Sequence, residues 1–309
     1  MGANHGPKPR GHHIVPACWL AGFTDTSEKT GTLWVTDLKR GKQWPSNPIK
    51  SGRRRDFNRL SDEQSDPLLV EANLAKIEDI IAPVLKRLDV ERRCPFKDEL
   101  HGLLQFMAIQ WARVPAFRPK IVSIAESIHR DILTKLLKTP ESWAAWLGEN
   151  DFEDGPPDEY ENWRDLLRSG FSLSVNNDWL LRKAFESTKT TIPCLQAKHW
   201  GCSISETGRF IGSDNPVMLD GTTPQIGFKN ADIVIYPVSR HVLLYGTAMA
   251  VRAPFLNLMY IARQNTFAML CAEEQVYSHV PDFYWLDENE RCQTDWSLFQ
   301  KDKILASVK

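Results

Sequence analysis

The chain lacks the sequence signals of several large classes of protein. No run of about 18 apolar residues is present, so we expect no membrane-spanning helix. Met1 to Pro16 has no apolar segment of the kind that a secretory signal contains, so we expect a cytoplasmic protein. Glycine-rich phosphate loops, HExxH, GxSxG and the kinase motifs are also missing, so we expect no nucleotide cofactor.

Cysteine and net charge are both low. The six cysteines form no CxxC pair, which argues against a finger-type zinc site and against a disulfide framework. Lysine and arginine number 38 and aspartate and glutamate 39, and the net charge of −1 gives no general attraction to nucleic acid or membrane. We therefore expect no membrane partner, and a nucleic acid would have to bind at a local patch.

Apolar spacing predicts an α+β protein with a helical middle. We expect a flexible arm over residues 1–11 and a single domain over 12–309, with a helical part at about 65–190 and a strand-rich part at about 199–278. A mixed or antiparallel sheet should combine an N-terminal hairpin, at residues 32–44, with strands from the C-terminal third. An acidic stretch at 149–161 is typical of an exposed loop.

Two predicted helices carry polar side chains on their apolar faces. Glu78 lies at the edge of an apolar stripe in a helix at 67–88, and Gln110 and Arg113 interrupt the apolar face of a helix at 97–114. A buried amide or guanidinium without a partner costs about 1–3 kcal/mol or more. We therefore expect Arg113 to pair with Glu78 or with a carboxylate elsewhere in the chain.

A polar triplet follows the predicted strand at residues 210–212. Ser213, Asp214 and Asn215 stand before Pro216, which lacks the N–H group that a central strand needs. The triplet either projects from the strand end into a cleft, with Asp214 as a second candidate partner for Arg113, or forms an Asx-type turn that caps its own backbone.

Histidines and arginines mark two more candidate sites. His12 and His13 precede a helix that we expect to start at Pro16, where an imidazole either faces a cleft or lies exposed beside the arm. A basic run is either ordinary solvated surface or a track for a polyanion. Its members are Lys39, Arg40, Lys42, Lys50, Arg53, Arg54 and Arg55.

The order of these motifs resembles the bacterial family called domain of unknown function 4238, over about residues 12–278. The resemblance rests on His13-Ile14-Val15-Pro16 with Trp19, Leu20 and Phe23, the strand at 33–37, the helix with Glu71 and Glu78, Gln110-x-x-Arg113-x-Pro115, Ser213-Asp214-Asn215-Pro216 and Tyr236-Pro237-Val238-Ser239. Ala17 and Cys18 depart from the family pattern. The resemblance implies a set of polar positions and no reaction.

These residue types suit metal-assisted hydrolysis of a phosphodiester. His13, Glu78 and Asp214 could hold Mg²⁺ or Mn²⁺, which would lower the pKa of a bound water. Gln110 and Arg113 could hold or orient a phosphate. Asn215 and the arginines Arg53, Arg54 and Arg55 would then bind substrate. A nuclease or related phosphoesterase, acting as an intracellular defence or toxin-type effector on nucleic acid, is the leading hypothesis.

Two other hypotheses stay open. In the first, the protein is not an enzyme, the network of Glu78, Gln110, Arg113 and Asp214 is structural, and the tryptophans bind a partner, either another protein or a second copy. In the second, a cysteine is a nucleophile, although the sequence places no histidine beside Cys18 or Cys202. An open cleft shared by the polar residues would favour the enzyme, and a sealed, fully paired cluster would favour the interaction protein.

Overall fold

Along the chain, antiparallel strands precede and follow a helical middle, which confirms the predicted α+β fold. The computed structural model describes residues 10–61, 66–149, 160–222, 226–251, 254 and 256–307. Over these residues, no helix combines the length and the apolarity that crossing a membrane requires.

The helices span most of the middle of the chain. They are α1 (Ala17–Leu20), α2 (Leu69–Glu91), α3 (Lys97–Arg113), α4 (Phe117–Leu136), α5 (Pro140–Glu149), α6 (Tyr160–Ser169), α7 (Asn177–Glu186), α8 (Thr188–Gln196), α9 (Leu258–Cys271) and α10 (Lys301–Ser307), with 3-10 turns η1 (Ala21–Phe23) and η2 (Trp296–Leu298). Asparagine side chains cap two of them: Asn176 accepts from the backbone of Asp178, and Asn257 from that of Tyr260.

The strands form two four-stranded sheets and two strand pairs, all antiparallel. They are β1 (Gly11–His13), β2 (Leu33–Asp37), β3 (Lys42–Ser46), β4 (Arg53–Arg55), β5 (His199–Ile204), β6 (Gly212–Ser213), β7 (Met218–Asp220), β8 (Ile233–Pro237), β9 (Val242–Thr247), β10 (Gln275–Ser278), β11 (Trp285–Leu286) and β12 (Cys292–Gln293). The sheet orders are β3-β2-β10-β6 and β5-β9-β8-β7, and the pairs are β1-β4 and β11-β12.

Strand β10 joins the two ends of the chain in one sheet. Val276 lies opposite Thr36 of β2 on one side and opposite Ser213 of β6 on the other. The N-terminal hairpin therefore shares a sheet with the C-terminal strands β10 and β6, while the other strands expected in that sheet, β5, β7, β8 and β9, form a sheet of their own. The segment that connects β2 to β6, β10, was not predicted as a strand, because its four residues are too few for a periodic pattern.

Trp19 anchors the larger of the two cores. Its side chain is fully buried, its ring lies 4.6 Å from that of Phe23, and its indole N–H donates to the carbonyl of Pro237 at 2.8 Å. Gly212 passes so close that a Cβ there would lie 2.6 Å from the Trp19 ring, so β6 requires glycine at this position. The second core surrounds Met269 of α9.

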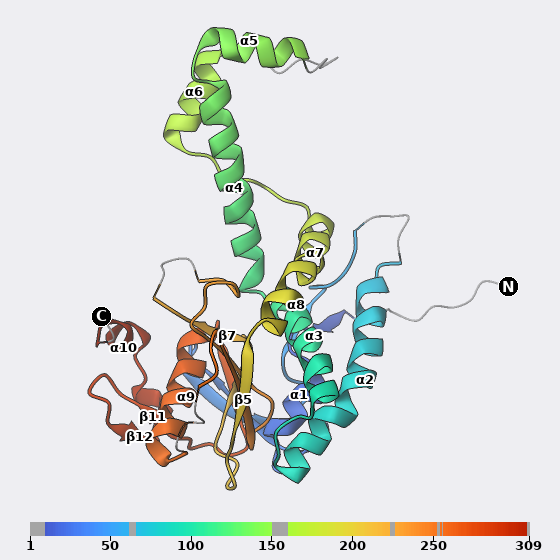
Figure 1. Cartoon of the computed structure of the whole chain (residues 1–309), viewed down its shortest axis with the longest axis vertical. Helices are drawn as coiled ribbons and strands as arrows, with labels where there is room; N and C mark the ends of the chain where they lie inside the picture. Colours follow the sequence, from blue (N-terminus) through green and yellow to red (C-terminus); the bar gives the residue numbers. More distant parts are fainter. Residues whose placement is uncertain are drawn as a thin grey trace, which may run out of the picture.

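Helices α4, α5 and α6 form an arm that projects from the sheets (Figure 1). None of the described α4 residues is buried. At the far end, Trp143 packs on Trp146 and Trp163, with ring centroids 5.3 and 5.9 Å apart. Several of the tryptophans therefore stabilise the end of the arm. The predicted acidic loop falls mainly at 150–159, outside the described residues.

The start of the chain differs from our expectation. Gly11, which we assigned to a flexible arm, belongs to β1 and pairs with Arg55 of β4. Residues 1–9 lie outside the described part. The predicted helical part at about 65–190 ends in two short helices, α7 and α8, with Ser187 between them. Long-range pairing and packing set these boundaries, and local patterns do not report them.

One disulfide was missed by the sequence analysis. Cys94, between α2 and α3, is bonded to Cys202 of β5, with their Cα atoms 5.8 Å apart and 108 positions between them in the sequence. We expected no disulfide framework because the cysteines are scattered. The folded chain nevertheless brings these two together, so one covalent link ties the helical part to the second sheet.

Replacing both Cys94 and Cys202 with serine should lower the free energy of unfolding by about 2–5 kcal/mol, because the link restricts the unfolded chain. Urea unfolding with and without a thiol reductant measures the effect. Reductant should weaken the wild type and leave the double variant unchanged. The matched control is Cys292→Ser, which replaces a free, half-buried cysteine. A wild type insensitive to reductant would contradict the prediction.

Candidate functional site

A cluster of buried polar side chains lies where β1, α2, α3 and β8 meet. We call it the polar cluster, and its members are His12, His13, Asn58, Glu71, Glu78, Gln110, Arg113 and Tyr236. Most of these side chains are buried. Glu78, with 17% of its side chain exposed, and the half-buried His13 form the side of the cluster that reaches solvent.

Arg113 connects three of these elements. From the end of α3, one guanidinium nitrogen donates to Glu78 Oε1 of α2 at 2.8 Å, and another donates to the backbone carbonyl of His13 in β1. Only 1% of the Arg113 side chain is exposed. The prediction that this arginine pairs with a carboxylate is confirmed, with Glu78 as the partner.

A second chain of contacts fixes β1 against α2. The backbone N–H of Asn58 donates to His12 Nδ1 at 2.9 Å, and the Asn58 amide donates to Glu71 Oε1 at 2.6 Å. His12 is therefore buried and acts as an acceptor, and is neither exposed nor facing an open cleft. These contacts place its neighbour His13 beside Arg113 and Glu78.

Several atoms of the cluster have no hydrogen-bond partner among the described residues. They are His12 Nε2, His13 Nε2, Asn58 Oδ1, both amide atoms of Gln110, Arg113 Nε and the hydroxyl of Tyr236. Gln110 lies next to the Tyr236 hydroxyl, but no hydrogen bond of good geometry joins them. Each such group costs about 1–3 kcal/mol when buried. The cluster therefore carries buried donors and acceptors that the described residues leave without partners.

The imidazole of His13 is kept neutral. Burial lowers its pKa, and the nearby charges of Arg53 and Arg113 lower it further, against the opposing effect of Glu78 and Glu71. At neutral pH the ring is therefore unprotonated and able to accept a proton. This combination of a neutral imidazole, a free ring nitrogen and an adjacent arginine is the chemically distinctive part of the cluster.

The cysteines do not supply a nucleophile here. Burial raises the pKa of the Cys18 thiol to about 12, so it stays protonated at neutral pH. Cys202 is held in the disulfide with Cys94. The geometry therefore gives the nucleophilic-cysteine hypothesis no support.

Asp214 does not join the polar cluster, contrary to our expectation. Its carboxylate accepts from three consecutive backbone N–H groups, those of Glu273, Glu274 and Gln275, at 2.8, 2.9 and 3.0 Å. Burial raises its pKa to about 6, although these three hydrogen bonds favour the charged form. Asp214 thus fixes the turn between α9 and β10. The sequence did not predict these partners of Asp214, because they are distant in the chain and local patterns do not report such contacts.

The expected metal ligands therefore do not meet. His13 and Glu78 lie in the polar cluster, while Asp214 is committed to backbone N–H groups of another turn. Across the described residues, no three histidine, cysteine, aspartate or glutamate side chains are arranged to hold a metal ion. The predicted set of His13, Glu78 and Asp214 does not fit Mg²⁺ or Mn²⁺.

The predicted substrate-binding residues are spread over two places. Asn215 donates to the carbonyl of Cys271 at 3.1 Å, beside the Asp214 turn. Arg53 donates to the carbonyl of Gly11 at 2.6 Å and is near enough to His13 to lower its pKa. Arg54 pairs with Glu274 at 3.4 Å and Arg55 with Asp56 at 3.6 Å. In the β1–β4 pair, Arg53 lies opposite His13 and Arg54 opposite His12, so both arginines flank the polar cluster.

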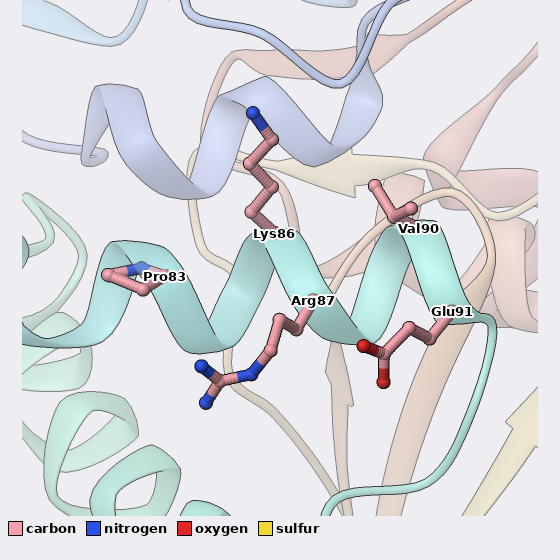
Figure 2. A pocket seen from close by; sticks show the side chains of 5 residues that line it. All are labelled: Pro83, Lys86, Arg87, Val90 and Glu91. Carbon is pink, nitrogen blue, oxygen red and sulfur yellow. The ribbon is translucent and has the colours of Figure 1, made fainter.

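A hollow on the outer surface of α2 is not connected with these residues. Pro83, Lys86, Arg87, Val90 and Glu91 line it, all from one helix. Figure 2 shows Lys86 and Val90 on one side of the helix and Arg87 and Glu91 on the other. The side chains do not converge, so we do not regard this hollow as the functional site.

Three members of the cluster were missed by the sequence analysis. Asn58 lies in a loop, and nothing in its local sequence marks it as buried. Glu71 and Tyr236 belong to motifs that we quoted, but we singled out other residues in each. The one available sequence signal was a tyrosine within the apolar segment that forms β8. Such a residue is expected to be buried, as Tyr236 is, and a buried hydroxyl needs a partner.

Asp214→Asn should lower the free energy of unfolding by about 1–3 kcal/mol, since an amide nitrogen would face backbone N–H groups that now donate to the carboxylate. Thermal and urea unfolding measure the change. Asp220→Asn, at an exposed position of β7, is the matched control and should have little effect. Equal stability of the two variants would show that the turn does not depend on this carboxylate.

Arg113→Ala should cost about 3–5 kcal/mol of stability, because it leaves Glu78 without its partner. The exposed pair Arg263–Glu290, with side chains 64% and 74% exposed, provides a control: Arg263→Ala should cost about 1 kcal/mol or less. A double-mutant cycle of Arg113→Ala with Glu78→Ala measures the coupling. A coupling near zero would contradict the pairing.

Comparison with known proteins places the chain in a family without assigning a reaction. The chain matches no curated protein and no solved structure. A family model described as a protein of unknown function (DUF4238) matches residues 11–281, which include every member of the polar cluster. The resemblance inferred from the motifs is thereby confirmed, and the chain belongs to the DUF4238 family.

Proposed function

We propose that this protein hydrolyses phosphodiesters and that the polar cluster is its site. The observation that carries the proposal is the neutral His13, whose Nε2 is free, beside Arg113 and Gln110, which also carry unpaired groups. A base next to hydrogen-bond donors is what the attack of water on a phosphodiester needs.

Each group has a chemical part in this proposal. His13 Nε2 accepts a proton from the attacking water, whose oxygen bonds to phosphorus while the bond from phosphorus to the leaving oxygen breaks, and the leaving oxygen takes a proton from solvent. The free N–H groups of Arg113 and Gln110 donate to phosphoryl oxygens and offset the charge that develops on them. Burial keeps the pKa of Tyr236 well above its usual value, so its hydroxyl stays protonated and remains a donor.

The substrate class follows from charge. Arg53 lies beside His13, and Arg54 and Arg55 continue along the same strand. A polyanion that reaches the cluster along β4 would meet these arginines first. A nucleic acid is therefore the substrate we favour, with binding that weakens as the salt concentration rises.

The test measures hydrolysis of single-stranded RNA, single-stranded DNA and bis(p-nitrophenyl) phosphate. His13→Gln should lower the rate by roughly 100-fold or more, the usual contribution of a general base. His129→Gln, at an exposed position of α4, is the matched control and should retain activity. Absence of hydrolysis by the folded wild type on all three substrates would refute the proposal.

Parallel reactions with Mg²⁺, with Mn²⁺ and with EDTA separate two forms of the proposal. Because the predicted ligand set does not assemble, His13 is expected to support activity in EDTA. Activity confined to the metal-containing reactions would place the metal ligands outside that set.

His13 also gives a pH dependence of stability. Its pKa is lower in the folded protein than the ordinary value near 6.5, so the unfolded chain binds a proton first as the pH falls. Stability should therefore decrease below about pH 6.5, and His13→Gln should reduce that decrease. His241 and His279 have lowered pKa values too, so the melting temperatures of wild type and variant are compared from about pH 7.5 to 5. Parallel curves would contradict a buried neutral His13.

A non-enzymatic interaction protein is the second candidate. It is favoured by Arg113, whose bonds to Glu78 and to the His13 carbonyl hold three elements together at 1% exposure. Under this proposal His13→Gln changes stability while no substrate is hydrolysed, so the same measurements distinguish the two.

A further inference from the structure

One face of α4 carries a row of exposed isoleucines. Ile124, Ile128 and Ile132 are 62%, 53% and 48% exposed, and Ile121 is half-buried. Their spacing of three or four residues places them on one side of the helix. We call this row the isoleucine face. Since α4 projects from the sheets, the face lies along the arm (Figure 1).

The opposite side of α4 is covered by the chain itself. The backbone N–H of Leu173 donates to Glu126 Oε1 at 2.9 Å, and the guanidinium of Arg130 lies 5.2 Å from the ring of Phe171. Glu126 and Arg130 lie about half a turn around the helix from Ile124 and Ile128. Residues 160–173 therefore pack against the polar side and leave the isoleucine face uncovered.

The face is complementary to itself when two copies of α4 run in opposite directions. Suppose that Ile124 lies opposite the partner's Ile128. In an antiparallel pair, residues nearer the N-terminus of one helix then face residues nearer the C-terminus of the other. That register brings Ile121 opposite the partner's Ile132 to within one residue. The two-fold relation repeats both pairs, so all four isoleucines of each copy are covered at once.

Charge supports the same register. Lys120 and Asp131 are exposed residues on one edge of the isoleucine face, since about 11 residues make three helical turns, and the Lys120 ammonium also lies 4.5 Å from the centre of the Trp111 ring. The antiparallel register that pairs the isoleucines also brings Lys120 opposite the partner's Asp131, and the symmetric pair forms as well. In a parallel register, Lys120 would instead lie beside the partner's Lys120 and Asp131 beside the partner's Asp131, and both pairs would be repulsive.

We propose that α4 packs antiparallel against α4 of a second copy, forming a homodimer through the isoleucine face. The overlap from Ile121 to Ile132 is about 16 Å long. Such a short contact predicts a dimer that dissociates on dilution.

Sedimentation equilibrium of the full chain over a range of concentrations tests the proposal. Ile128→Asp should raise the dimer dissociation constant by roughly 100-fold or more, because two buried carboxylates would lie close to the two-fold axis. The matched control is Ile80→Asp on α2, which replaces an isoleucine that is 76% exposed. A wild type that remains monomeric at the highest concentration would overturn the proposal, as would equal effects of the two variants.

Engineered cysteines test the direction of the pairing. Mixing Ile121→Cys with Ile132→Cys chains should give a disulfide between copies, identified by peptide mapping, while neither variant alone should cross-link through the new cysteine. Self-cross-linking of Ile121→Cys would indicate a parallel pair and contradict the proposal.

A charge exchange tests the partner itself. Asp131→Lys should weaken the dimer, and adding Lys120→Glu in the same chain should restore it, because the pair is then reversed. A lack of restoration would contradict the register. If the isoleucine face instead bound lipid vesicles or another protein, Asp131→Lys would not be rescued and the chain would sediment as a monomer.

Discussion

The guanidinium of Arg113 is the constraint around which the first part of the structure is arranged. A charge that is almost completely buried must find partners, and it finds them in Glu78 of α2 and the backbone of His13 in β1. These bonds fix where β1 meets the helices. Since β1 pairs with β4, the position of the arginine-rich strand follows from the same interaction.

Asp214 fulfils a similar role at the other end of the chain. Its carboxylate organises the turn that leads from α9 into β10, and β10 is the strand that joins β2 to β6. Two buried charged side chains thus hold together segments that are far apart in the sequence. Arg113 joins β1 to α2 and α3, and Asp214 joins β6 to the turn before β10. They act separately, and so two polar motifs that interrupt apolar sequence need not belong to one site.

The sequence predicted what depends on local pattern. The α+β class, the N-terminal hairpin, α3 and the burial of Gln110 and Arg113 all follow from apolar spacing and from the cost of an unpaired charge. Strand β1, strand β10 and the Cys94–Cys202 link depend on partners far along the chain, which no local pattern encodes. The grouping of Asp214 with His13 failed for the same reason: both are anomalous locally, but the fold gives them different partners.

Gln110 differs from the other members of the polar cluster in how its polar atoms are satisfied. Arg113 and Glu78 satisfy each other, and His12, Asn58 and Glu71 are joined in a chain of hydrogen bonds. Gln110 is completely buried, and its polar contact is with the Tyr236 hydroxyl, to which no hydrogen bond of good geometry joins it. An apolar side chain of similar size would avoid the cost of burying an amide. The buried amide next to a neutral histidine is the feature on which the proposal of a ligand-binding site depends.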